Sequence, residues 1–261
     1  MADPREDDPI DDKPMPLLDH LIELRRRLIW SMAAFMLTFF IAYYFSKQVY
    51  TFLAQPLADI LQEKGGGDRR MIFTALYEAF FTYLKVAMFS AAFVSFPVVA
   101  TQIWMFVAPG LYRSEKRAML PFLVATPVLF FLGGALAYYF VFPFAWAFFL
   151  SFEIPAGGGG LPIQLEAKVG EYLDLVMKLI FAFGITFELP VLLTLLAKVG
   201  IVTSASLKKF RRYAYVGMFV VAAILAPPDV ITQVGLAVPL IILYEISIVT
   251  ARWVAPKPAE D

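Results

Sequence analysis

The sequence predicts an all-α membrane protein whose helices cross a lipid bilayer about six times. Two bulk observations support this prediction: 60% of the 261 residues are hydrophobic, and the mean hydropathy is +0.71. Soluble domains are about 45–50% apolar, so the surplus must face lipid rather than water. The third observation is that the apolar residues fall into separate long runs, and about 20 such residues cross a hydrocarbon core as one helix.

The predicted helices form one domain over residues 17–253, between an acidic tail at 1–16 that is typical of disorder and a short tail at 254–261. The third span is free of charge and lacks a polar turn, so we expect one long helix with kinks at its prolines and glycines. The fifth and sixth apolar stretches are short for a bilayer, so either their polar flanks snorkel to the surface or the bilayer thins beside them. The predicted spans cover residues 28–45, 77–107, 119–150, 172–196, 213–226 and 230–249.

Basic residues predict the orientation of these spans. Cytoplasmic flanks of membrane proteins carry an excess of Lys and Arg. With both termini placed in the cytoplasm, fifteen Lys and Arg residues lie on the cytoplasmic side and five on the other side. An even number of spans with both termini inside follows from this count. The loop at 47–70, which contains Pro56, and the short turn that ends at Asp229 are expected on the outer side.

The sequence contains no recognisable catalytic or metal-binding motif. Lys and Arg number 22, as do Asp and Glu, so no excess of positive charge suggests a nucleic-acid partner. Cysteine is absent and His20 is the one histidine, which excludes a disulfide, a zinc cluster and a thiol nucleophile. The spacings typical of metalloproteases, serine hydrolases and phosphate-binding loops do not occur. We therefore expect no enzyme activity, no catalytic residues, no metal and no cofactor.

Ionisable side chains inside the spans require a structural or functional explanation, because placing a charge in lipid costs free energy. Glu188 lies near the middle of its span with no basic residue within a turn, and Gln233 is a weaker case. Glu188 is either structural, hydrogen-bonded to a neighbouring helix, or a polar site for a partner helix or a substrate. Two further pairs have the spacing of one helix face and are expected to be solvated or to snorkel: Glu78 with Lys85, and Asp174 with Lys178.

Two carboxylates on the predicted cytoplasmic side suggest a ligand. Glu23 precedes the first span and could pair with Arg27 one turn later, and Glu115 lies in the next cytoplasmic loop. Each acid alone is more often solvated than functional. Together they would suit a ligand that carries two arginines, because a guanidinium binds a carboxylate through two hydrogen bonds.

Several longer motifs, in order, resemble the TatC family of twin-arginine protein translocases. The resemblance extends from about residue 17 to residue 253. It implies a six-helix, cup-shaped receptor in the bacterial cytoplasmic membrane that recognises twin-arginine signal peptides of folded proteins, whose export uses the proton-motive force. The motifs are His20–Arg27, Gln102–Pro109, Leu111–Arg117, Phe183–Pro190 and Pro227–Val230.

The resemblance also implies roles for particular residues. Glu23 and Glu115 would hold the arginines of the signal, with Arg25 and Phe106 nearby. The single-span partner subunits TatA and TatB would dock on the intramembrane surface, and the protein would associate with itself in a larger complex. The residues implied on that surface or in functionally important outer loops are Gln102, Glu188, Gln233, Pro56 and Asp229.

One alternative remains open from the residues themselves. A secondary transporter or channel for small solutes could use Glu188 as its proton or ion site. Transporters often contain inverted repeats, and the two halves of this sequence show no convincing repeat. An intramembrane enzyme is disfavoured by the missing motifs.

Overall fold

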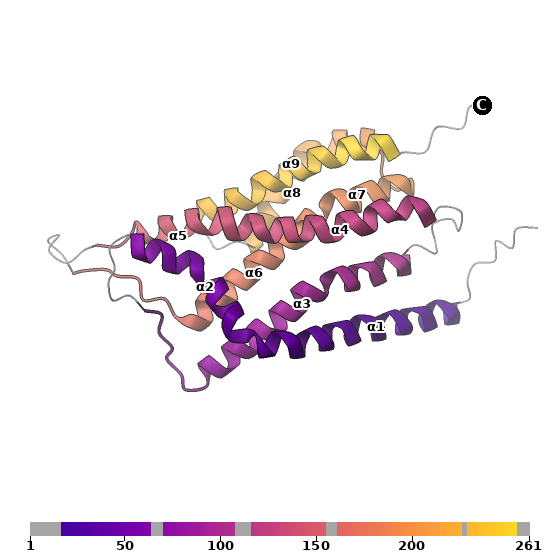
Figure 1. Cartoon of the computed structure of the whole chain (residues 1–261). Coiled ribbons are helices and arrows are strands. Elements are labelled where there is room, and N and C mark those ends of the chain that lie inside the picture. The colour runs from indigo at the N-terminus through magenta and orange to yellow at the C-terminus, as the bar shows by residue number, and fades with distance from the viewer. Residues whose placement is uncertain (1–16, 64–69, 108–115, 155–160, 226–228, 255–261) are drawn as a thin grey trace, which may run out of the picture.

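The computed structural model describes residues 17–63, 70–107, 116–154, 161–225 and 229–254, and these segments are almost entirely helical. The helices lie side by side as an elongated bundle (Figure 1). In chain order they are α1 (Leu17–Tyr44), α2 (Ser46–Glu63), α3 (Glu78–Val107), α4 (Lys116–Leu136), the π-helical turn η3 (Ala137–Val141), α5 (Phe142–Leu150), α6 (Val169–Phe187), α7 (Leu189–Lys198), α8 (Ser204–Leu225) and α9 (Val230–Val254).

Six rods run along the bundle, because α4, η3 and α5 follow one another without a break and α7 continues α6. Helix α1 begins and α9 ends at the same end of the molecule (Figure 1), which we call the terminal end. The opposite end carries α2 and is called the α2 end. Five rods in the described segments are long and apolar enough to cross a membrane, and α8 lies alongside them as the sixth rod (Figure 1). The all-α prediction with six crossings is therefore confirmed.

The two C-terminal rods are the shortest of the six. Helix α8 has 22 residues and α9 has 25, against 28 in α1 and 30 in α3. Both extend beyond the apolar stretches predicted at 213–226 and 230–249, because their charged ends are helical too. In α8 the charged turns at 208–212 precede the apolar part, so the apolar length remains short.

The third rod is a single long helix, as expected, and its irregularity is a π-helical turn at Ala137–Val141. Such turns accommodate one extra residue within an α-helix. Pro143 follows in the first turn of α5, where a missing N–H is tolerated. The irregularity therefore separates a glycine-containing half of the rod from an aromatic-rich half.

Helix α2 corrects the expectation of a loop at 47–70. Residues 46–63 form a helix with Pro56 inside it. The helix is amphipathic, and it buries Leu53, Leu57 and Ile60 against the rest of the bundle. The spacing of these three residues fits a helix, but a proline within the sequence argues against one.

Two tyrosines explain how α2 tolerates its proline. Pro56 has no N–H, so the carbonyl of Phe52 four residues earlier loses its helical donor. The Tyr138 hydroxyl donates to that carbonyl over 2.6 Å, and its ring stacks on Phe52 with centroids 4.4 Å apart. The Tyr172 hydroxyl donates to the next carbonyl, that of Leu53, over 3.0 Å. The Tyr138 hydroxyl thus replaces the donor that Pro56 lacks, and the Tyr172 hydroxyl adds a second bond that fixes α2 to α6.

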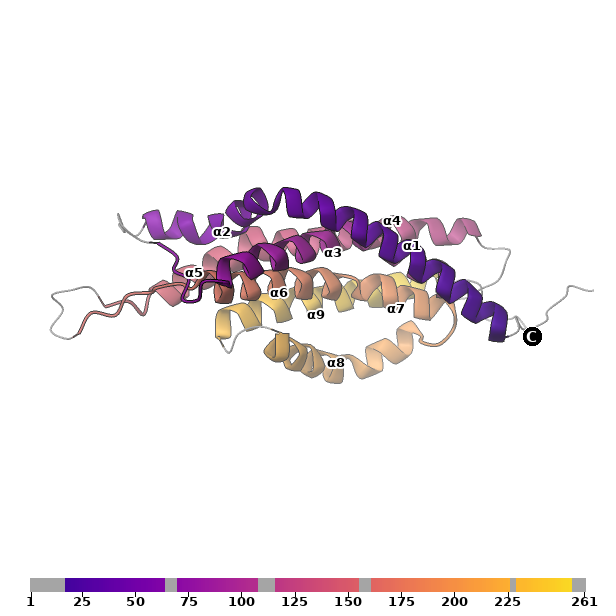
Figure 2. The same ribbon diagram turned by 90° about the horizontal axis from the view of Figure 1, so that it is seen from below.

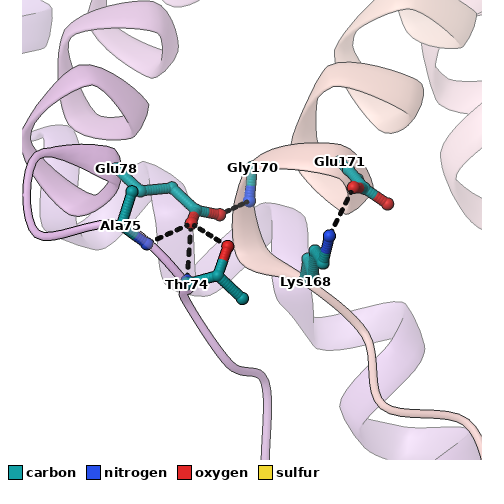
Figure 3. A network of polar contacts seen from close by, with 6 residues as sticks. All are labelled: Thr74, Ala75, Glu78, Lys168, Gly170 and Glu171. Atoms are coloured by element: carbon teal, nitrogen blue, oxygen red, sulfur yellow. Dashed lines mark hydrogen bonds and ion pairs between the residues drawn. The ribbon is translucent and has the colours of Figure 1, made fainter.

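A second set of contacts at the α2 end joins the start of α3 to the start of α6 (Figure 3). Glu78 Oε2 accepts hydrogen bonds from the backbone N–H groups of Thr74 (2.8 Å) and Ala75 (3.3 Å) and from the Thr74 hydroxyl (3.4 Å). Its Oε1 accepts from the Gly170 N–H over 3.3 Å. One carboxylate thereby satisfies free N–H groups at two helix starts.

The core surrounds α6. Phe130, Phe142 and Phe183 are fully buried, and α4 approaches α6 so closely that a Cβ on Gly133 would lie 2.5 Å from the Phe183 carbonyl oxygen. By contrast, no residue in the apolar window of α1 is buried. Figure 2 shows α1 and α8 at opposite margins, with α6 between them.

Candidate functional site

At the terminal end, α1 and α3 bring together an acid, a base and an amide. Arg27 donates from Nε to Oε1 of Glu23 over 3.0 Å, and its Nη2 pairs with the same oxygen. Its Nη1 also reaches Gln102 Oε1 on α3 at 3.5 Å. The side chains of Arg27 and Glu23 are only 20% and 21% exposed. Among the described residues Oε2 of Glu23 has no partner, so the carboxylate can accept a further cationic donor.

Helical spacing places these side chains on one face of α1. His20, Glu23 and Arg27 are half-buried along the stripe that faces α3, whereas Arg25 is exposed. The His20 ring stacks on Phe106 of α3, with centroids 4.3 Å apart and planes at 21°. Of the predicted residues, the structure therefore gathers Glu23, Gln102 and Phe106 at one place, and the pairing of Glu23 with Arg27 is as expected.

Glu115, the second predicted acid, lies outside the described residues. Helix α4, which begins at the following residue, starts at the terminal end (Figure 1). The pairing of two acids around one ligand therefore stays a prediction.

A second polar position interrupts the fourth rod. Glu188 lies between two helices, as the C-cap of α6 and the N-cap of α7, with φ −73° and ψ −9°. Pro190 causes the interruption, because it removes an N–H and its ring crowds the carbonyl four residues earlier. The sequence placed Glu188 in mid-helix, and the structure corrects this to the junction of α6 and α7.

Glu188 lines a cavity of about 620 Å³ between α3, α4, α6, α7, α8 and α9. Both its carboxylate oxygens are buried and lack a hydrogen-bond partner among the described residues. Trp104 donates to the hydroxyl of Thr126 across the same cavity over 3.0 Å, and the other lining side chains are almost all apolar. The nearest candidate for a structural hydrogen bond to a neighbouring helix is the Thr126 hydroxyl of α4, which interacts with this carboxyl but lies beyond ordinary hydrogen-bond geometry. An unpartnered carboxyl in an apolar cavity is instead a binding-site candidate.

Comparison with known proteins decides the family. The model of the family "Sec-independent protein translocase protein (TatC)" matches residues 19–239. The chain belongs to the TatC family. TatC of Magnetococcus marinus is 53% identical over 94% of this chain and 87% of its own length, and TatC of Escherichia coli K12 is 39% identical over 93% and 90%.

Solved structures agree with the family assignment. The "Crystal Structure of Twin Arginine Translocase Receptor- TatC" superposes with a TM-score of 0.72 at 41% identity, over 89% of this chain and 97% of that one. A second TatC crystal structure, in the detergent DDM, gives a TM-score of 0.75 at 40% identity, over 89% and 99%. Membership of the TatC family makes the chain a multi-pass inner-membrane component of protein transport, not an enzyme or a small-solute transporter.

Other ionisable residues of this TatC family member form cross-helix contacts that helical spacing alone did not predict. Lys85 of α3 binds both carboxylate oxygens of Asp174 on α6, at 2.9 and 2.7 Å. Lys85 and Asp174 are each 51% exposed, in keeping with the expectation of solvated side chains, but they pair across two helices rather than along one. Glu78 serves the helix starts instead. A spacing along one helix, such as that of Glu78 and Lys85 or of Asp174 and Lys178, cannot reveal which neighbouring helix a side chain faces.

A contact between α8 and α9 was missed entirely. Arg211 Nη2 binds Glu245 Oε2 over 2.6 Å, and the Tyr215 hydroxyl bonds to the other oxygen of the same carboxylate. One signal was available, since Arg211 and Tyr215 are four residues apart on one helix and Glu245 is the one acid of α9. The three residues fasten the charged half of α8 to α9.

Asp229 and Gln233 have local structural roles. Asp229 is only 8% exposed and caps α9: its Oδ1 accepts from the Thr232 N–H over 2.8 Å, and its Oδ2 bonds to the Thr232 hydroxyl. Gln233 makes a long contact of 3.5 Å to the Phe219 carbonyl of α8. Among the described residues, no group of His, Cys, Asp and Glu gathers as metal ligands.

Proposed function

We propose that this chain is the receptor core of a twin-arginine translocase and that its terminal end, in the cytoplasm, binds the two arginines of a signal peptide. One observation carries the proposal: the half-buried carboxylate of Glu23 already accepts a guanidinium, that of Arg27, and its Oε2 has no partner among the described residues. A second guanidinium has the geometry and charge to use that oxygen.

The excess of Lys and Arg on the terminal side supports the cytoplasmic placement of both termini. A folded cargo remains in the cytoplasm while its signal peptide is recognised, so the binding site must lie on that side. Phe106 and His20 provide an aromatic surface beside Glu23, and guanidinium groups stack favourably on such surfaces. Glu115 would supply the second acid.

The test is photo-cross-linking of a twin-arginine peptide to the purified chain. We expect labelling at the Glu23 face of α1 and its loss when both arginines of the peptide are replaced by lysine. Glu23→Gln should reduce affinity by about 1.5–3 kcal/mol if the site excludes water on binding. Asp19→Asn is the matched control, because Asp19 is an exposed acid one turn earlier.

Equal labelling by the arginine and lysine peptides would contradict the receptor function. Equal effects of the Glu23 and Asp19 variants would show that bulk charge, rather than the Glu23 site, attracts the peptide.

We further propose that single-span partner subunits, corresponding to TatA and TatB, dock in the Glu188 cavity. Two features support this: the cavity is apolar, as a transmembrane helix requires, and its one carboxyl lacks a partner. A polar side chain on the docking helix would satisfy that carboxyl. Gly217→Leu would fill the cavity from α8, where nothing lies within 4 Å of the Cβ position. We expect it to abolish co-purification of a partner while peptide binding persists; retained co-purification would contradict this docking site.

A further inference from the structure

A second cavity, of about 690 Å³, lies where α1 ends and α2 begins. It is distinct from the Glu188 cavity and from the Glu23 site at the opposite end of α1. Its walls come from the last turn of α1, the first turn of α2 and the start of α3. The side chains that matter to its chemistry are Tyr43, Tyr44, Ser46, Lys47, Gln48 and Tyr83.

Two side chains of this cavity lack a partner. Ser46 is only 8% exposed, yet its hydroxyl makes no hydrogen bond to any described residue. This hydroxyl belongs to a residue on the cavity wall and is available to donate to a ligand. Lys47 is exposed and forms no ion pair with the described residues. No acid lines the cavity, so the charge of Lys47 is uncompensated there.

The position along α2 adds to this positive potential. Helix α2 has 18 residues and starts at Ser46. The positive end of its helix dipole therefore lies beside Lys47, and helix starts of this kind favour anions. A hydroxyl donor, an ammonium group and a helix start together make a site for a phosphate group.

The surroundings indicate where the phosphate comes from. The cavity lies at the end of an apolar span, Leu18–Tyr44, at the depth where tyrosines mark the membrane interface. Beside it Phe40, Tyr44 and Phe80 are 65%, 78% and 57% exposed. These rings offer an apolar path for acyl chains next to the polar site, which a soluble phosphate would not need.

We propose that this cavity binds an anionic phospholipid, with Lys47 and Ser46 contacting its phosphate. Bound lipid would occupy the elbow between α1 and α2 and so support the angle at which α2 leaves the span. This site is independent of signal-peptide recognition.

The test measures binding of short-chain phosphatidylglycerol to the purified full chain in detergent by native mass spectrometry. Phosphatidylcholine with the same acyl chains is the comparison. We expect a preference for phosphatidylglycerol in the native chain. Lys47→Gln should weaken it roughly tenfold, about the effect of one charge-assisted hydrogen bond, and Ser46→Ala by a smaller factor. Lys208→Gln, which removes the same charge at the start of α8, is the matched control and should leave the affinity unchanged.

Three results would overturn the proposal. The first is equal binding of the two lipids by the native chain. The second is an equal loss in the Lys47 and Lys208 variants, which would indicate diffuse charge attraction. The third is displacement of the lipid by inorganic phosphate at millimolar concentration, which would identify a soluble anion as the ligand.

Discussion

Glu78 and Glu188 are both glutamates of membrane-embedded rods, yet their surroundings differ completely. Glu78, at the α2 end, accepts hydrogen bonds from two helix starts. Glu188 is buried, but its carboxylate has no partner among the described residues. Because an unsatisfied buried polar group destabilises a fold, we expect Glu188 to interact with a group outside the described residues. The comparison separates a part of the molecule built for rigidity from a part kept open for binding.

Glycines mark the same division. At Gly133, between α4 and α6, an added Cβ would meet the Phe183 backbone at 2.5 Å, whereas at Gly217, on the wall of the Glu188 cavity, it would meet nothing within 4 Å. The close approach of α4 to α6 therefore requires glycine at position 133, whereas position 217 has room for a side chain.

The largest expected effect comes from adding one methyl group at each glycine. Gly133→Ala should destabilise the fold by about 3 kcal/mol, at the upper end for overpacking, because the clash is with backbone that cannot turn away. Gly217→Ala should be neutral or stabilising by up to ~1 kcal/mol, the gain in helix propensity. Unfolding in mixed micelles followed by circular dichroism measures both. Equal stability of the two variants would contradict the contrast between the tightly packed contact of α4 with α6 and the open wall of the Glu188 cavity.

A smaller effect is expected from the tyrosine that serves the proline of α2. Tyr138→Phe removes the donor to the Phe52 carbonyl, which Pro56 leaves unpaired, and should cost about 1–3 kcal/mol for a buried unsatisfied group. Tyr139→Phe is the control, since the neighbouring ring is 63% exposed. The same unfolding assay applies, and a loss of similar size in both variants would show that the hydroxyl bond is unimportant.

The sequence predicts the rods well because a bilayer imposes a simple rule on length and apolarity. It predicts α2 poorly, because Pro56 argues against a helix and the compensating donor, the Tyr138 hydroxyl, lies 86 residues after the Phe52 carbonyl that it serves. The local sequence shows that α2 lacks a hydrogen-bond donor at Pro56, but the replacing donor is supplied by tertiary packing.

The candidate site shows a similar limit. Helical spacing correctly suggests the contact of Glu23 with Arg27, since both lie on one helix. The partner of Lys85 could not be found this way, because rotation of α3 and α6 about their axes decides that Lys85 meets Asp174. For Glu188 the sequence shows that an acid is present, but only the packing of six helices shows that it faces a cavity.

A matched pair of substitutions tests the contrast between the two glutamates. Glu78→Gln replaces an acceptor oxygen by a donor that faces N–H groups, so the unfolding temperature should fall. Glu188→Gln removes no hydrogen bond within the described residues, so the unfolding temperature should hold or rise, while export of a twin-arginine precursor from cells falls. Unimpaired export by the Glu188 variant would remove the reason to regard the cavity as a binding site.

The smallest expected effect concerns the site at the terminal end. Arg27 binds Oε1 of Glu23 in the absence of ligand. It therefore competes with an arginine of the incoming signal for the Glu23 carboxylate. Arg27→Gln should therefore raise the affinity for a twin-arginine peptide about threefold, in keeping with the ~1 kcal/mol or less of a partly exposed ion pair. Arg26→Gln, at an exposed neighbour, should not raise it. Titration calorimetry measures both. Weaker binding by the Arg27 variant would mean that Arg27 holds the carboxylate in position for the signal instead of competing for it.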